Sequence, residues 1–320
     1  MKPKNCLIFG ASGQIGRHLI RKLTKNNYKV IAVTRNLHQK GYVLKTQASA
    51  GWIDCVEANI FKEENLRDLI RQSDICINLI GILFEKGKVN TFKNIHSSFP
   101  DLISRICSEY GVEQFIQLSA LGIDEAKDSE YAKSKLIGEK NIKNNFSNAM
   151  ILRPSVVFSV DDQFSCSFMT LLNRMPIFPL YYNGKTKFQP IHVSDLVEII
   201  YQVISKKIIS STIECVGPEK ISFRSILNIL LKLINKKRLL LPFPLPLAKF
   251  SAKLFQLMPK PLLTEDQLKL LAYDNINTGR YKTNFDINVP SLCFFEKEVE
   301  KYCYMWKEGG QFSTKKYNSN

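Results

Sequence analysis

The sequence has no pair of cysteines at the spacing of a metal or redox motif. Its eight cysteines are scattered, and its four histidines, His18, His38, His96 and His192, are equally dispersed. We therefore expect reduced thiols in a cytoplasmic protein and no metal site. The sequence also has no internal repeat and no low-complexity segment, so we expect an ordinary globular chain.

Acidic residues are few, since 29 Asp and Glu stand against 45 Lys and Arg, and the formal net charge is +16. Such a balance suits a nucleic acid, an acidic membrane surface or an acidic partner. The lysines are spread along the whole chain and no nucleic-acid-binding module is recognisable, so we expect no nucleic-acid ligand. The first strand begins close to Met1, which predicts that no signal or transit peptide is present.

A long apolar segment, residues 239–258, is unsuited to span a membrane because it contains two lysines and because three prolines interrupt its start. Beyond the prolines the pattern is amphipathic, with Phe250, Leu254 and Leu257 on one side and Lys249, Lys253 and Gln256 on the other. This pattern predicts a helix that lies on a membrane surface or in a partner groove. Packing of the same helix against its own lobe is the alternative.

A glycine-rich turn follows the first apolar strand, and residues 6–17 read Cys-Leu-Ile-Phe-Gly-Ala-Ser-Gly-Gln-Ile-Gly-Arg. Gly10 allows a tight turn, Gly13 lets the backbone approach phosphates, and Gly16 lets the next helix pack close to its strand. The N–H groups at the start of that helix face the bound anion. The turn therefore predicts a site for the pyrophosphate of a dinucleotide, although taken alone it also fits an ordinary strand-to-helix turn.

Strand-like and helix-like segments alternate in the first half of the chain. Apolar runs at residues 28–33, 52–58, 75–79, 114–119 and 149–157 are separated by helical patterns such as 66–71 and 102–110. This rhythm predicts an α/β protein with a Rossmann-type doubly wound parallel sheet and a smaller C-terminal lobe. Ligands of such sheets bind at the carboxyl ends of the strands. In this sequence these ends carry Gly10, Arg35, Asn59, Gly81 and Ser119.

We expect three regions along the chain. Residues 1–160 form the NAD(P)-binding Rossmann core, residues 161–290 return strands to the sheet and form a lobe that closes the cleft, and residues 291–320 form a C-terminal tail. Within the second region the patterns predict a helix over 164–173, a strand over 188–192, a helix over 196–204 capped by Ser194 and Asp195, and a helix over 222–234 that starts from Ser222.

The end of the second strand indicates which dinucleotide is bound. It reads Val33-Thr34-Arg35-Asn36 and lacks the Asp or Glu that an NAD site usually places there. Arg35 offers a planar donor fork to a 2′-phosphate, and Arg17 is able to reach the same region. The sequence therefore favours NADPH over NADH, with two solvated arginines as the alternative.

Tyr131 and Lys135 lie four residues apart on a predicted helix, so both side chains project from the same face. Ser119, which closes the fifth strand, is the candidate third member of this group. Without the glycine-rich turn such a pair would be interpreted as surface residues. With that turn upstream the pair predicts contact with the cofactor, and whether turnover occurs stays open.

These motifs resemble the short-chain dehydrogenase/reductase superfamily in its extended and atypical branches. More narrowly, the chain resembles the NADPH-binding accessory subunit of respiratory complex I (NADH:quinone oxidoreductase) and its bacterial relatives. The stretches that carry the resemblance are 10–17, 77–81, 131–139, 152–158, 188–195, 215–218, 241–246 and 262–268 with Asp274-Asn275. The resemblance covers residues 4–290, and Leu-Pro-Phe-Pro-Leu-Pro at 241–246 is its most specific part. Asn59 and Ser159 depart from it, since many relatives carry Asp and Gly there.

The resemblance implies roles for individual residues. Tyr131 would be the acid/base of the superfamily, and Lys135 would bind the nicotinamide ribose and lower the pKa of the phenol. The cofactor-binding residues that the resemblance and the glycine-rich turn together predict are Gly10, Ala11, Ser12, Gly13, Gln14, Ile15, Gly16, Arg17, Arg35, Asn59, Ile60, Ile80, Gly81, Ser119, Tyr131, Lys135, Pro154 and Val156.

Two functions fit these features. The distal motifs favour an NADPH-binding accessory subunit of complex I, whose partners are other complex I subunits and which sits in the cytoplasm, peripherally on the inner face of the membrane. The Tyr131–Lys135 pair favours a soluble NADPH-dependent reductase, epimerase or dehydratase. A regulatory NADPH sensor is a third interpretation that the sequence does not distinguish.

Overall fold

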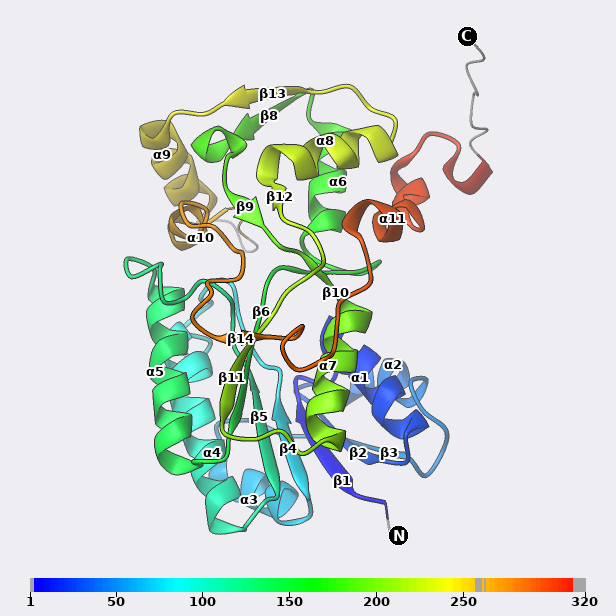
Figure 1. Ribbon diagram of the computed structural model, residues 1–320, viewed down its shortest axis with the longest axis vertical. Helices are drawn as coiled ribbons and strands as arrows, with labels where there is room; N and C mark the ends of the chain where they lie inside the picture. The colour runs from blue at the N-terminus through cyan, green and yellow to red at the C-terminus, as the bar shows by residue number, and fades with distance from the viewer. Residues whose placement is uncertain (1–2, 257–260, 262, 313–320) are drawn as a thin grey trace.

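The computed structural model describes residues 3–256, 261 and 263–312. Its centre is an eight-stranded parallel sheet (Figure 1). In sheet order the strands are β14 (Lys282–Thr283), β11 (Ser211–Cys215), β6 (Met150–Pro154), β5 (Gln114–Leu118), β4 (Ile75–Asn78), β1 (Asn5–Phe9), β2 (Lys29–Thr34) and β3 (Ile53–Glu57). The order of the strands reverses between β4 and β1, where a doubly wound sheet binds its ligand. The predicted Rossmann-type fold is confirmed.

Helices cover both faces of the sheet (Figure 1). Both faces need cover because both are apolar. In strand β1, Cys6 and Ile8 are buried in the core on one face, while Leu7 and Phe9 are buried in the core on the other. One face packs on α1 (Gln14–Lys25), α2 (Leu37–Lys45) and α7 (Val193–Ser205). The opposite face packs on α3 (Glu63–Arg71), α4 (Phe99–Glu109) and α5 (Glu130–Asn145), with a π-helical turn (Lys93–Ser98) leading into α4.

A smaller lobe lies beyond the carboxyl ends of the strands (Figure 1). Its elements are α6 (Ser165–Arg174), β8 (Ile177–Leu180), α8 (Phe223–Leu233), β13 (Leu239–Pro242), α9 (Leu245–Phe255), α10 (Glu265–Leu270) and α11 (Phe295–Glu300). Short strand pairs connect the two parts: β7 (Val157–Phe158) with β10 (Ile191–His192), and β9 (Lys187–Phe188) with β12 (Ile221–Ser222). Short 3-10 turns complete the lobe at Tyr181–Gly184, Cys303–Trp306 and Gly310–Phe312. None of the helices described is long and apolar enough to cross a membrane.

Two of the predicted strands are interrupted, so those predictions are wrong in detail. The run 149–157 divides into β6 and β7, and the run 188–192 divides into the end of β9 and β10. Asn275 causes both breaks, since its side-chain Oδ1 accepts hydrogen bonds from Ser155 Oγ (2.6 Å) and Val156 N (3.1 Å), and its main-chain oxygen accepts one from Gln189 N (3.0 Å). After β6 the chain leaves the main sheet at these bonds, whereas β9 and β10 both pair outside that sheet.

The predicted cap of the helix over 196–204 is also wrong. Helix α7 begins at Val193, and the cap is His192, whose ring accepts a hydrogen bond from Ser194 N at 3.4 Å. The carboxylate of Asp195 instead accepts hydrogen bonds from the main-chain N–H groups of Leu292 and Cys293 (3.1 and 3.0 Å). It thereby holds the segment that leads into α11. The cap at Ser222 is confirmed, because Ser222 Oγ accepts from Ser225 N at 3.1 Å.

The amphipathic helix predicted within residues 239–258 is α9, which begins at Leu245 and is preceded by strand β13. Its inward face consists of Ala248 and Ala252, both fully buried, whereas the Phe250 side chain is 69% exposed. Phe250 therefore does not pack against its own lobe. The side chain of Leu254, and all of Leu257 and Met258, lie outside the described residues, as do residues 313–320 of the predicted tail.

A buried ion pair ties α5 to the sheet. The guanidinium of Arg153, 3% exposed at the end of β6, donates two hydrogen bonds to the carboxylate of Glu139 on α5 (2.9 and 2.7 Å), which is 5% exposed. Arg153 also pairs with Asp124, and the centroid of the Tyr281 ring lies 4.5 Å from the guanidinium carbon. A bidentate ion pair of this kind offsets the free-energy cost of removing both charges from water.

Replacing Glu139 by Gln should lower the free energy of unfolding by about 3–5 kcal/mol, because Arg153 would keep its charge in the interior with half of its partners lost. Urea unfolding of the full chain measures this. The control is Glu130→Gln, which breaks the exposed pair with Lys133 and should cost about 1 kcal/mol or less. Equal effects of the two changes would contradict the prediction.

Candidate functional site

The glycine-rich turn between β1 and α1 has the geometry of an anion cradle. Gly10 adopts a φ of +81°, and a Cβ there would lie 3.2 Å from the main-chain nitrogen of Ile80. A Cβ on Gly16 would lie 2.4 Å from the carbonyl oxygen of Ala11, so α1 packs on the turn only with glycine. Helix α1 starts at Gln14 with Gly13 as its cap, and no side chain occupies its first N–H groups. These N–H groups suit the pyrophosphate of a dinucleotide.

A cavity of about 190 Å³ lies beside the segment that follows β3. Ile60, which follows β3, is one of its walls, and the neighbouring Asn59 accepts a hydrogen bond from Phe61 N (3.0 Å) that shapes the turn. Sequence reasoning included Asn59 and Ile60 but missed the other walls, which come from Phe61, the π-helical turn and α4. The complete lining is Ile60, Phe61, Asn94, Ser98, Phe99 and Leu102.

The two arginines proposed for a 2′-phosphate have different surroundings. Arg17 forms an ion pair with Asp161, and Asp161 in turn accepts a hydrogen bond from Ser159 Oγ (2.6 Å). Gln14 Nε2 donates to the same Ser159 Oγ (2.7 Å), so Ser159 connects the loop after β7 to the glycine-rich turn. Arg35 is exposed beyond β2, and within the described part of the chain no carboxylate pairs with it. Arg35 is therefore the arginine whose charge is free for a phosphate.

Tyr131 and Lys135 project together from α5, as predicted. Lys135 Nζ lies 5.5 Å from the centroid of the Tyr131 ring. The Gly81 backbone approaches the same point, since a Cβ on Gly81 would be 3.7 Å from Lys135 Nζ. No hydrogen bond or ion pair from the residues that the structure describes engages this ammonium. The arrangement therefore leaves it free to bind a ribose hydroxyl.

His96 completes this group and was missed by sequence reasoning. Its ring meets the Tyr131 ring edge-on, with centroids 5.1 Å apart, and Phe92 meets Tyr131 in the same way at 5.9 Å. His96 Nε2 accepts from Ile82 N (3.1 Å), so Nδ1 carries the proton and donates to Ser134 Oγ (3.0 Å). Nothing in the local sequence marks His96, because it lies on the π-helical turn, 35 residues before Tyr131.

Burial controls the ionisation of all three groups. It raises the pKa of Tyr131, and the carboxylate of Asp266 raises it further. It lowers the pKa of Lys135 to about 8, although the negative charge of Glu139 acts to raise it. It also lowers the pKa of His96 to about 2, with a further contribution from Lys135, so His96 is neutral. The direction for Tyr131 is opposite to the lowering that the resemblance implies.

Ser119 lies directly after β5 and is 6% exposed. Its N–H donates to the carbonyl of Leu152 (2.7 Å), but its Oγ is buried and has no hydrogen-bond partner among the residues the structure describes. An unpaired buried hydroxyl is costly and is expected where a ligand supplies the partner. Pro154 and Val156 follow at the end of β6, where the Pro154 carbonyl accepts from Leu121 N (2.9 Å).

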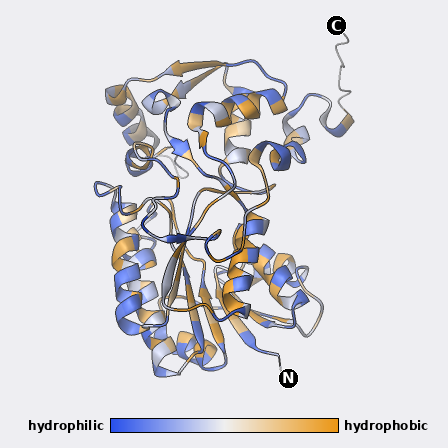
Figure 2. Cartoon of the chain, viewed as in Figure 1, coloured by the Kyte–Doolittle hydropathy of each residue, from blue (hydrophilic) through white to orange (hydrophobic). Residues whose placement is uncertain are grey.

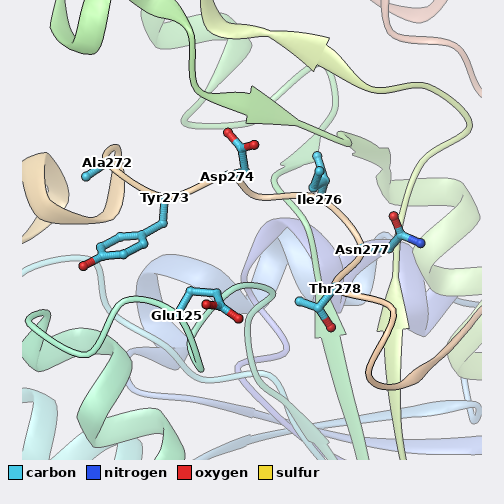
Figure 3. A pocket seen from close by; sticks show the side chains of 7 residues that line it. All are labelled: Glu125, Ala272, Tyr273, Asp274, Ile276, Asn277 and Thr278. Atoms are coloured by element: carbon cyan, nitrogen blue, oxygen red, sulfur yellow. The ribbon is translucent and has the colours of Figure 1, made fainter.

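A larger hollow of about 450 Å³ lies at the junction of the two lobes (Figure 3). Figure 3 shows its walls, which come from the segment between α10 and β14 and from Glu125 in the loop after β5. The lining residues are Glu125, Ala272, Tyr273, Asp274, Ile276, Asn277 and Thr278. None of the predicted cofactor residues is among them, so this hollow is separate from the dinucleotide cradle.

The lowered pKa of Lys135 predicts a pH effect on stability. The unfolded chain keeps this proton up to about pH 10.5, whereas the folded chain releases it near pH 8. Between these values the unfolded state binds more protons, so the stability of the unmodified protein should rise with pH relative to Lys135→Met, by about 3 kcal/mol in total. Urea unfolding from pH 7 to pH 10 measures the difference. Lys140→Met, on the exposed side of α5, is the control, and a difference for Lys135→Met that does not change with pH would contradict the prediction.

The sequence matches the NAD dependent epimerase/dehydratase family over residues 6–212. It is 27% identical to NADH dehydrogenase (ubiquinone) 1 alpha subcomplex subunit 9, mitochondrial, of Mus musculus, over 84% of this chain and 72% of that protein. It is 25% identical to the NADH-ubiquinone oxidoreductase 40 kDa subunit, mitochondrial, of Neurospora crassa, over 88% of this chain and 74% of that protein.

Among solved structures, the Bordetella bronchiseptica enzyme WbmG in complex with NAD has a similar fold. The TM-score is 0.71, the sequence identity is 11%, and the match covers 95% of this chain and 94% of that chain. At this identity the likeness shows the fold alone. Because the family match spans more than half of the sequence, this chain belongs to the NAD dependent epimerase/dehydratase family and has its NAD(P)-binding fold.

Proposed function

We propose that this protein is an NADPH-binding accessory subunit of complex I. The observation that carries the proposal is the extent of the similarity. The family match ends at residue 212, but the similarity to the mouse and Neurospora complex I subunits covers 84% and 88% of the chain. The similarity therefore extends into the distal lobe, whose sequence general nucleotide binding does not constrain.

The cofactor proposal rests on the strand ends. The glycine-rich turn offers N–H groups to a pyrophosphate, and the exposed Arg35 after β2 offers a charge that no carboxylate of the described residues compensates. Lys135 Nζ and the unpaired Ser119 Oγ are suited to the nicotinamide ribose and the nicotinamide. When bound, the dinucleotide would serve either as a structural ligand or as a hydride carrier. The free charge at Arg35 is the feature that favours NADPH over NADH.

The docking proposal rests on one face of the distal lobe, which we call the β8–β13–α9 face. Strand β13 pairs with β8 in parallel, so alternate side chains of both strands point outward. The exposed apolar residues of the face are Ile177 (49%), Leu239 (55%), Leu241 (41%), Leu245 (39%), Leu247 (54%) and Phe250 (69%). Figure 2 shows this apolar region at the end of the molecule remote from the N-terminus.

Basic residues border the same face. Arg174 and Lys237 are exposed on the adjoining segments, and Lys249 and Lys253 are exposed on α9 itself. An apolar face with a cationic rim suits attachment to another subunit close to an anionic membrane surface. These features support a cytoplasmic protein held peripherally at the inner face of the membrane through complex I.

A soluble NADPH-dependent reductase, epimerase or dehydratase is the second candidate. The close approach of Tyr131 to Lys135 and the unpaired Ser119 Oγ favour it. The raised pKa of Tyr131 makes proton release from the phenol harder in this setting. The accessory subunit is therefore the better supported of the two functions.

Replacing Arg35 by Asp should reverse the cofactor preference, because it removes a charge-assisted contact to the 2′-phosphate and adds a repulsion. The expected loss of NADPH affinity is about 2–4 kcal/mol, with little change for NADH. Calorimetric titration of both cofactors measures it. Arg71→Asp, at the exposed end of α3, is the control for net charge. Equal affinity of the unmodified protein for NADPH and NADH would contradict the proposal for the cofactor.

Membrane fractions of cells should contain the unmodified protein together with complex I subunits, and the double change Leu247→Ser with Phe250→Ser should release it. Burial of each side chain is worth roughly 1.5–3 kcal/mol, so binding should weaken by about a hundredfold or more. Tyr42→Ser removes an equally exposed aromatic ring (71%) on α2 and is the control.

Both serine variants should keep the stability of the unmodified protein, since the side chains removed are exposed. A high-salt wash should weaken only the contribution of the lipid surface. If the unmodified protein stays in the soluble fraction and a pull-down recovers no complex I subunit, the accessory-subunit proposal is wrong. Turnover abolished by Tyr131→Phe would then identify the soluble enzyme.

A further inference from the structure

The first turn of α5, which carries Tyr131, is capped from the distal lobe. Ser129 is the N-cap residue of this helix, and its Oγ accepts a hydrogen bond from Ala132 N at 3.2 Å. The next two N–H groups, those of Glu130 and Tyr131, donate to the carboxylate of Asp266 at 2.8 and 3.1 Å. Ser129 Oγ donates to the same carboxylate at 2.7 Å. A single carboxylate, more than 130 residues away in the chain, therefore satisfies the start of this helix.

Asp266 is held firmly by its own lobe. It lies in the first turn of α10, whose start is fixed by reciprocal bonds between Thr264 and Gln267 (3.1 and 3.0 Å). At the other end of α10, Tyr182 Oη donates to the carbonyl of Leu268 (3.1 Å), and Thr186 Oγ1 donates to that of Leu271 (2.5 Å). The position of the carboxylate is therefore set by the distal lobe.

The same contact region reaches the Tyr131 side chain. Leu270 and Tyr273, which follow Asp266 on and after α10, belong to one apolar cluster with Tyr131, and Tyr273 Oη donates to Asp128 Oδ1 at 3.0 Å. Charge adds to this packing, because a carboxylate at a helix N-terminus interacts favourably with the helix dipole. Lys135 lies one turn further along the same helix, so the first turn sets where Tyr131 stands relative to Lys135.

We propose that Asp266 is a positioning residue through which the distal lobe sets the nicotinamide end of the cofactor site. The inference rests on the proposed cofactor function. It assigns a role to Asp266 within the segment 263–268, which general nucleotide binding does not require. The adenosine end does not depend on this contact, because it is built from the glycine-rich turn, Arg35 and the cavity beside Ile60. The two ends of the cofactor therefore respond differently to the loss of Asp266.

Two ligands separate these ends in the full chain. NADPH contacts both ends, whereas adenosine 2′,5′-bisphosphate lacks the nicotinamide ribose and contacts only the adenosine end. With Asp266→Ala, the affinity for NADPH should fall about tenfold, as expected from the loss of a helix cap. The affinity for adenosine 2′,5′-bisphosphate should stay within about twofold of that of the unmodified protein, since no contact at its end is removed.

Asp266→Asn keeps one oxygen acceptor without the charge, should give a smaller loss of NADPH affinity, and serves as the test if Asp266→Ala fails to fold. The control is Glu265→Gln, which removes the adjacent carboxylate that pairs with Lys253 at 3.7 Å and should leave both affinities unchanged. Equal losses for the two ligands, or no loss for NADPH, would overturn the proposal. Binding of neither ligand by the unmodified protein would refute the proposed function itself.

Discussion

The position of α5 depends on a close approach that only glycine permits. A Cβ on Gly138 would lie 1.9 Å from the carbonyl oxygen of His96. Because Gly138 has no Cβ, the π-helical turn packs directly against the helix. This packing places the His96 ring beside Tyr131 and Lys135. The next residue, Glu139, forms an ion pair with the buried Arg153. One pair of neighbouring residues, Gly138 and Glu139, thus fixes the helix that carries the candidate site.

The distal motifs connect the two lobes of the molecule. Asn275 bonds to the loop after β5 at Leu121, to Ser155 after β6, and to Gln189 between β9 and β10. Gly217 is required because a Cβ there would lie 1.7 Å from the carbonyl oxygen of Pro190. Together with Asp266 these residues fix the lobes relative to each other.

The sequence was accurate where a signal is local. The strands around Ile8, Ile31 and Ile77 follow from continuous apolar runs, and the turn around Gly13 follows from glycine spacing. It was inaccurate where bonds from distant residues decide the outcome. Asn275 interrupts two predicted strands, and Asp195 binds the N–H groups of Leu292 and Cys293 instead of capping α7. The local sequence of those segments contains no trace of these partners, since the partners lie in other parts of the chain.

The sequence by itself determined the parallel sheet, the anion cradle and the pairing of Tyr131 with Lys135, because each depends on the period of a strand or helix over a few residues. The tertiary structure alone decided the neutral His96 against Tyr131, the unpaired hydroxyl of Ser119 and the cap that Asp266 provides. Folding buries these groups and brings together elements from distant parts of the chain. Burial and distance set their hydrogen bonds and pKa values, and neither quantity can be read from residues adjacent in sequence.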